Sequence, residues 1–322
     1  MLSRVADSLF WLGRYIERAE ANARILDVNL QLMLDSEGSG PAWEKTGWQP
    51  IISTLEYQTL FNKLFDRVDG GTVMEFVTFS KENPNSIRSS IGLARENART
   101  VREFISSEMW ERINHLYLWV NSEDARQLFA GSAIDFFRRV VDGAHQFHGT
   151  TNATVTHGEG WNFLQFGKYL ERADNVSRIL DLKYHVLLPS EERVGGMIDT
   201  IQWNAVLKSC SAYEAYRKLH PGQVTPWSVA EFIVLHHDFP RSVRFCVDGL
   251  DASLHRISGT DRQHFSNEAE RLTGKLCGDL NYETIENIFA VGLHEYLDNI
   301  QGRLIEISVA MREKFCGLVP VE

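Results

Sequence analysis

The sequence predicts an all-α protein, a single compact helical bundle built from two duplicated halves. Apolar residues recur at the three- and four-residue spacing of helix faces. We find no convincing series of alternating apolar and polar residues that would indicate strands. One motif also occurs twice, 154 residues apart. We therefore expect one domain over residues 1–322, with internal repeats at about 1–154 and 155–322, because a period of this size exceeds that of solenoid repeats.

The repeated motif is predicted to be helical. Residues 13–28 and 167–182 share nine identities in sixteen positions. In each copy a glutamate and an arginine seven residues later lie nearly in line, on a stripe with apolar residues on both sides. An unpaired charge buried among apolar residues costs roughly several kcal/mol. Each of these glutamates and arginines should therefore have a partner on another helix or in a ligand. The four residues are Glu17, Arg24, Glu171 and Arg178.

A glycine precedes each motif glutamate by one turn. Glycine inside a helix costs about 1 kcal/mol relative to alanine. We therefore expect another backbone or a ligand to approach closely at Gly13 and Gly167.

The other elements follow from periodicity and from helix breakers. A long helix is predicted over residues 3–34, and it ends at a loop over residues 35–41. Breaks are predicted at Asp69-Gly70-Gly71, at residues 82–86, and in a linker between the halves at residues 149–160. Between these breaks, helical patterns cover residues 48–65, 73–79, 87–105, 109–118 and 122–148.

A second alignment supports the doubling. At an offset of 156, residues 73–88 and 229–244 share Val, Glu, Phe, Pro, Ser and Arg. Offsets that stay nearly constant across distant segments indicate an internal duplication. A pseudo-twofold arrangement, with the two motif helices meeting near the axis, is the simplest geometry for such a chain.

The bulk composition excludes several classes of function. The net charge of −10 argues against nucleic-acid and anionic-membrane binding, which both need clustered positive charge. No apolar run approaches the ~20 residues of a membrane span, and the first residues lack the apolar segment of a signal peptide. Four widely spaced cysteines without a CxxC pair indicate reduced thiols in a cytoplasmic protein.

Four segments carry a resemblance to a known family: residues 1–20, 83–88, 94–99 and 158–174. They resemble the alpha-E family, bacterial all-helical proteins named for glutamate-arginine motifs, and the resemblance covers essentially the whole chain. It implies neighbourhood with circularly permuted ATP-grasp proteins, transglutaminase-like proteins and proteasome-like hydrolases. It therefore also implies a role in peptide synthesis or modification.

The duplicated charged residues allow two interpretations. They either form interhelical salt bridges that set the register of the bundle, or they line a polar pocket in which arginines hold an anion and glutamates hold an amine. Arg18 and Arg172 lie about 100° around the helix from the adjacent glutamates, so they need not share a site with them. The full set is Glu17, Arg18, Arg24, Glu171, Arg172 and Arg178.

Further candidates lie outside the motif. Ser86 with Arg88, and Ser242 with Arg244, follow proline breaks at helix starts, where either an N-cap or an anion site is expected. Asn97 lies in a helical segment rich in charged residues, whose spacing fits ion pairs on a solvated helix surface. Asn97 has no charge, so such pairs do not account for it. In the loop before the second motif, His157 and Glu159 are candidates for acid-base work or are simply exposed.

Neither a metal nor a cofactor is expected. No Glu-x-x-His of di-iron bundles occurs, and no phosphate-binding glycine loop or nucleophile elbow is present. The nearest metal-like sets, Asp142 with His145 and His148, and His236-His237-Asp238, fit a helix surface or a helix end.

The resemblance and the charged set together suggest an accessory helical protein of an ATP-grasp-linked peptide-modification system. It would bind a peptide, or a partner ATP-grasp or transglutaminase-like protein, through an Arg/Glu-lined central cleft. Two alternatives stay open. One is an enzyme of peptide-bond formation or hydrolysis that uses Glu17 or Glu171 as a base, and the other is a purely structural partner.

Overall fold

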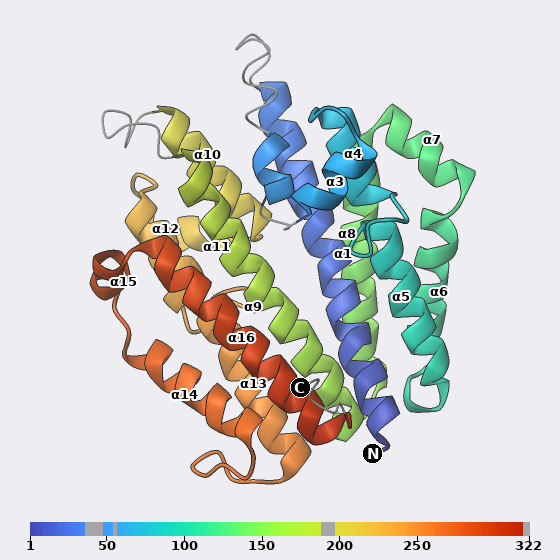
Figure 1. The fold of residues 1–322 in the computed structure, drawn as a ribbon, viewed down its shortest axis with the longest axis vertical. Helices are drawn as coiled ribbons and strands as arrows, with labels where there is room; N and C mark the ends of the chain where they lie inside the picture. The colour runs from blue at the N-terminus through green and yellow to red at the C-terminus, as the bar shows by residue number, and fades with distance from the viewer. Residues whose placement is uncertain (36–47, 54–56, 188–196, 318–322) are drawn as a thin grey trace.

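A computed structural model of the protein describes residues 1–35, 48–53, 57–187 and 197–317. These residues form an all-α, compact bundle, as predicted, and no strand occurs in the part of the chain that the model describes (Figure 1). The four cysteines are free, as expected. No helix over these residues combines the length and the hydropathy needed to cross a bilayer.

The N-terminal half surrounds one long helix. Residues 48–53 are helical as well. The other elements are α1 (Ser3–Asp35), α3 (Gln58–Leu64), α4 (Gly70–Thr78), α5 (Ile87–Thr100), a 3-10 turn (Arg102–Phe104), α6 (Ser107–Val120), α7 (Glu123–Gly131) and α8 (Ala133–Thr154).

The C-terminal half surrounds a second long helix. Its elements are α9 (Glu159–Leu187), α10 (Met197–Ser209), α11 (Tyr213–Leu219), α12 (Pro226–Leu235), α13 (Val243–Ser258), α14 (Glu268–Tyr282), α15 (Ile285–Val291) and α16 (Leu293–Phe315).

Several predicted boundaries were wrong. The helix that begins at Ile87 ends at Thr100 instead of continuing to Ile105. Ser132 divides the pattern over residues 122–148, because its extended backbone ends α7 and its side chain caps α8. The linker between the halves shrinks to residues 155–158, since α8 extends to Thr154 and α9 begins at Glu159. The predicted helix over residues 48–65 is interrupted. Leu55 and the loop residues from 36 onwards lie outside the described part of the chain.

The two motif helices, α1 and α9, pack side by side in the middle of the molecule (Figure 1). A β-carbon on Gly13 would collide with the carbonyl oxygen of Leu164, and one on Gly167 would collide with that of Phe10. The expected close approach at both glycines is therefore confirmed: each makes room for the backbone of the other helix.

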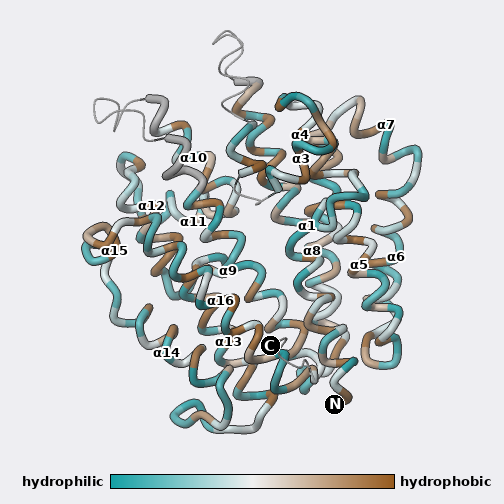
Figure 2. Tube along the Cα trace, viewed as in Figure 1, coloured by the Kyte–Doolittle hydropathy of each residue, from teal (hydrophilic) through white to brown (hydrophobic). Residues whose placement is uncertain are grey.

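Each central helix carries a corresponding set of neighbours. α5 and α8 pack on α1, while α13 and α16 pack on α9. Hydrophilic and hydrophobic residues are mixed along outer helices such as α6 and α14 (Figure 2). The buried residues recur every three or four positions, as a single buried helix face requires; in α6 they are Met109, Ile113, Leu116 and Val120. This layout is consistent with a duplication, which stays a prediction, and it places the charged motif at the contact between the halves.

Candidate functional site

Glu171 on α9 is paired with arginines of α1. Arg18 Nε donates to Glu171 Oε1 at 2.6 Å, and Arg14 Nε donates to Oε2 at 2.6 Å. The Glu171 residue is only 2% exposed. Burial by itself would raise the pKa of this carboxyl, but the charges of Arg18 and Arg14 outweigh that effect and hold the pKa at about 2.

Glu17 on α1 has the reciprocal arrangement. Arg172 of α9 donates from Nε and Nη2 to its two oxygens, at 2.7 and 2.8 Å, and Arg241 adds a bond from Nη1 at 2.9 Å. Burial opposes ionisation of this carboxyl, yet Arg172 and Arg241 hold its pKa well below the usual range. Arg18 and Arg172 thus share the site with the motif glutamates, although each pairs with the glutamate of the opposite helix.

The loops before α5 and α13 complete these two pairs. Arg18 Nη1 donates to the side-chain oxygen of Asn85, and Arg172 Nη1 donates to the carbonyl of Pro240 at 3.1 Å. Asn22 of α1 also donates to the carbonyl of Asn85, at 2.7 Å. The proline breaks that start α5 and α13 therefore position both loops against the central helices.

A third carboxylate extends the cluster towards the surface. Glu20 is fully buried, and its Oε1 accepts bonds from Arg24 Nε at 2.9 Å and from Arg241 Nη2. His145 Nε2 of α8 lies 3.0 Å from the same oxygen. The other oxygen, Oε2, has no hydrogen-bond partner. Burial would raise the pKa of Glu20, but the nearby arginines, Arg241 first, lower it to about 2.

Two further titratable groups border the cluster. His148 Nε2 lies 3.4 Å from Glu17 Oε2, and neither ring nitrogen makes a hydrogen bond. Burial lowers the pKa of His148, against the opposing effect of the Glu17 carboxylate, and so favours the neutral ring. Burial, with the charge of Arg172, also lowers the pKa of Lys168 to about 8. His145 is exposed on α8, as expected for a helix surface, although its ring reaches Glu20. The same expectation was wrong for His148, which is largely buried against Glu17 of α1.

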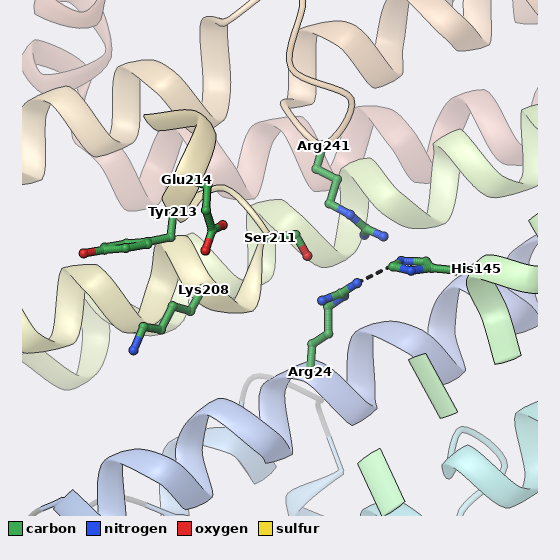
Figure 3. A pocket seen from close by; sticks show the side chains of 7 residues that line it. All are labelled: Arg24, His145, Lys208, Ser211, Tyr213, Glu214 and Arg241. Carbon is green, nitrogen blue, oxygen red and sulfur yellow. Dashed lines mark hydrogen bonds between the residues drawn. The ribbon is translucent and has the colours of Figure 1, made fainter. Parts of the chain in front are cut away.

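An open pocket of about 410 Å³ lies beside Glu20. Arg24 from α1, His145 from α8, Arg241 from the loop before α13 and Ser211 from the turn after α10 point towards one another there (Figure 3). The remaining lining residues are Lys208, Tyr213 and Glu214. The expected central cleft is therefore displaced: Glu17 and Glu171 are closed off by their arginine partners, and the open space begins at Arg24.

The other predicted residues make their contacts elsewhere. Arg178 pairs with Asp174 of its own helix at 3.0 Å. Arg88 Nε donates to Asn121 at 2.7 Å, Arg244 Nη1 to the Leu235 carbonyl at 3.4 Å, and the Asn97 side chain to the Leu93 carbonyl at 2.8 Å.

The two predicted N-caps are confirmed. Ser86 and Ser242 each accept a bond from a backbone N–H, at 3.1 Å. Their hydroxyls satisfy the helix starts, so Arg88 and Arg244 have no shared anion site with them in this arrangement.

The loop candidates lie at the far end of α9. His157 stacks on Trp161 with ring centroids 4.2 Å apart, and Glu159 pairs with the N-terminal amine at 3.1 Å. Glu159 precedes Glu171 by twelve helical residues, roughly 18 Å along the axis. These two residues therefore belong to the closure of the bundle end and not to the central cluster.

Comparison with known families assigns the chain to one of them. Residues 1–316 match the family model of Alpha-E, described as a predicted alpha-helical domain with a conserved ER motif. The chain belongs to the Alpha-E family. Glu17-Arg18 and Glu171-Arg172 are the Glu-Arg pairs that this Alpha-E protein brings together at its centre.

Two curated relatives are similar over most of the chain. They are the uncharacterized protein Mb2597 of Mycobacterium bovis and the uncharacterized protein Rv2567 of Mycobacterium tuberculosis. Each is 25% identical over 329 residues, which covers 96% of this chain and 36% of the relative. The Alpha-E chain thus spans about a third of the length of these relatives. No solved structure matches it.

Three side chains in the Alpha-E cluster have the geometry of metal ligands. Donor atoms of Glu17, Glu20 and His148 all lie within 4.8 Å of one another. Both oxygens of Glu17 and Oε1 of Glu20, however, already accept bonds from three guanidinium groups, and only Glu20 Oε2 is left without a partner. A divalent cation would add two charges where cations already exceed anions, so the donor set does not fit a metal.

Six residues of the cluster were missed as site candidates: Arg14, Glu20, His145, His148, Lys168 and Arg241. Two signals were available. Glu20 lies three residues after Glu17 on the same helix face, and His145 and His148 have the same spacing on α8. Arg241 follows a proline in the loop before α13, and nothing in the sequence connects it to α1.

Proposed function

We propose that this Alpha-E protein is a non-catalytic accessory protein of a peptide-synthesis or peptide-modification system, and that it binds an acidic group of a peptide in the pocket beside Glu20. The main support for this proposal is that Arg24 and Arg241, with side chains only 16% and 12% exposed, flank an open pocket. Guanidinium groups held in place by a buried carboxylate are ready donors for a carboxylate or a phosphate, because little side-chain freedom remains to be lost.

The catalytic alternative has less support from the same geometry. A general base works best with a pKa near the working pH. The arginines instead lower the pKa of Glu17 and hold that of Glu171 at about 2, and both carboxylates are buried. Such groups are weak bases, and they are already occupied as hydrogen-bond acceptors.

The partner in this proposal comes from the family resemblance: a circularly permuted ATP-grasp protein, or a transglutaminase-like protein, encoded nearby. The relatives' length gives related support, since the part similar to this chain makes up 36% of Mb2597 and Rv2567. In those longer chains the similar part lies beside other protein segments, which supports a role next to a partner domain or protein.

Two binding experiments test the proposal. In the first, isothermal titration calorimetry compares a short peptide rich in Asp and Glu with its Asn and Gln counterpart. We expect binding of the acidic peptide only, and a tenfold or greater loss in Arg241→Gln. Arg99→Gln is the matched control, because it removes the same charge from a side chain that is 64% exposed and lies outside the pocket.

In the second experiment, the tagged protein is used to capture the purified ATP-grasp protein encoded beside it. Capture by the wild type and by Arg99→Gln is expected. If the acidic peptide fails to bind and the ATP-grasp protein is not captured, the accessory role is wrong.

A further inference from the structure

The buried cluster beside the pocket holds more positive than negative charge. Among the described residues, its mutually bonded groups are three guanidinium groups and two carboxylates, from Arg24, Arg172, Arg241, Glu17 and Glu20. The ammonium group of Lys168 next to Arg172 adds a fourth cation. The cluster therefore has about two uncompensated positive charges when Lys168 is protonated.

This excess runs against the charge of the whole chain, which is −10. Buried like charges repel one another at low dielectric, and a buried charge without a counterion is costly. Burial, and after it the charge of Arg172, lower the pKa of Lys168 to about 8. An anion in the adjoining pocket would remove the imbalance.

The pocket also has hydrogen-bond donors that remain unused. Arg24 uses Nε and Nη2, and Arg241 uses Nη1 and Nη2, so each guanidinium keeps one nitrogen with no bond to a described residue. Both groups point into the pocket with His145 (Figure 3). Lys208 and Glu214 line the other side and offset each other in charge.

Ser211 supplies a third donor from an unusual position. It follows α10 and has a φ of +52°. The turn has the two hydrogen bonds of a Schellman motif. Ser211 N–H donates to the Lys208 carbonyl at 2.9 Å, and Ala212 N–H donates to the Leu207 carbonyl at 2.7 Å. Glycine is the usual residue at this position. Serine stands here instead, with a buried Oγ that has no hydrogen-bond partner.

We propose that the pocket binds a dianionic group, a phosphate monoester or two neighbouring carboxylates, between Arg24 and Arg241, with the Ser211 hydroxyl as an additional donor. This inference rests on the proposed function, because it names the ligand class of the same pocket. A single carboxylate would neutralise only part of the excess charge, and its two oxygens would leave donors unused. A volume of about 410 Å³ accommodates such a group with one attached residue.

Calorimetry with three probes tests the ligand class: inorganic phosphate, malonate and acetate, at pH 7.5 and equal ionic strength. We expect phosphate and malonate to bind at least tenfold more tightly than acetate. Whichever of the two dianions binds more tightly distinguishes a phosphate site from a dicarboxylate site. Arg241→Gln should lower the affinity for both dianions by tenfold or more. Ser211→Ala should lower it by about threefold. Arg99→Gln should leave all three affinities unchanged.

The variants also separate this inference from the proposed function. Ser211→Ala removes one hydroxyl and no charge, so it keeps the test valid even if Arg241→Gln fails to fold. Equal affinities for acetate and the dianions, or dianion binding that neither variant alters, would overturn the dianion site while acidic-peptide binding could still stand. If the acidic peptide and all three anions fail to bind, both the ligand class and the proposed function are wrong.

Discussion

The Arg172 guanidinium group bonds both carboxylate oxygens of Glu17, at 2.7 and 2.8 Å, across the contact between α1 and α9. The equivalent positions 154 residues away show the exchanged pair, with Arg18 bonded to Glu171. Such reciprocity, in which position i contacts j and j contacts i, is the signature of an isologous twofold contact. Within one chain it is the arrangement that a duplicated and refolded half would produce.

The Glu171 pair should be important for stability. Glu171→Gln removes the charge that Arg14 and Arg18 both bond, and it leaves two guanidinium groups without a counterion in a buried setting. Breaking a buried pair in this way costs about 3 kcal/mol or more. We expect urea denaturation to show a loss of at least this size in the free energy of unfolding.

Glu159→Gln is the matched control for that measurement. Glu159 is 42% exposed, and its partner is the N-terminal amine at the protein surface. Exposed pairs contribute about 1 kcal/mol or less. Equal losses in the two variants would show that the central pairs contribute no more to stability than a surface contact does.

The pairing itself was only partly predictable from the sequence. Apolar flanks on both sides of Glu17 and Glu171 correctly predicted burial and the need for partners, since both properties follow from helix geometry. Arg24 and Arg178 were expected to find partners on another helix or in a ligand, but each forms an ion pair within its own helix. The partner is the acidic residue four positions earlier, Glu20 or Asp174, a spacing that places two side chains next to each other on one helix face.

The pocket could not be predicted at all. It joins α1, α8, the turn after α10 and the loop before α13, and these segments meet only through the packing of the two halves. Periodicity describes one helix at a time, so it carries no information about which loop covers which helix. Arg241 is the clearest case, because its importance depends on a loop that reaches Glu17 and Glu20 from more than 200 positions away in the chain.

The close contact of α1 and α9 predicts a sharp difference among glycines. A β-carbon in Gly13→Ala or Gly167→Ala would overlap a backbone carbonyl oxygen of the opposite helix, which cannot move away without separating the helices. We expect each variant to lose about 2 kcal/mol or more of stability, in the range of overpacked cores.

Gly274→Ala in α14 is the control for these glycines, because nothing lies within 4 Å of its added β-carbon. Alanine favours the helix by about 1 kcal/mol relative to glycine, so this variant should gain stability. Thermal unfolding of the three variants provides the comparison. A stable Gly13→Ala protein would contradict the close packing of the central helices.

Stability should also depend on pH with a definite sign. The pKa of Glu171 and of Glu20 is about 2 in the folded protein, against 4.5 for an unperturbed carboxyl. A lowered folded-state pKa gives a contribution that is complete above pH 4.5 and is lost as the pH falls towards 2. We expect the urea midpoint to fall in this window, and to fall less steeply in Glu171→Gln. Parallel profiles for the two proteins would mean that Glu171 does not titrate with a lowered pKa.

Replacing Ser211 with glycine should increase the stability of the fold and weaken anion binding in the pocket. At the residue after a helix end, with φ at +52°, glycine avoids a steric cost of about 1 kcal/mol that serine bears. Ser211→Gly should therefore raise the free energy of unfolding by about this amount, while it removes the hydroxyl from the pocket. Gly259→Ser is the mirror experiment: Gly259 ends α13 with φ at +77° and open space around it, so serine there should cost a similar amount. Chemical denaturation of both variants, with the anion titration of Ser211→Gly, completes the test. If Ser211→Gly is no more stable than the wild type, the strain at this turn has been misjudged, and the case for a serine retained for binding weakens with it.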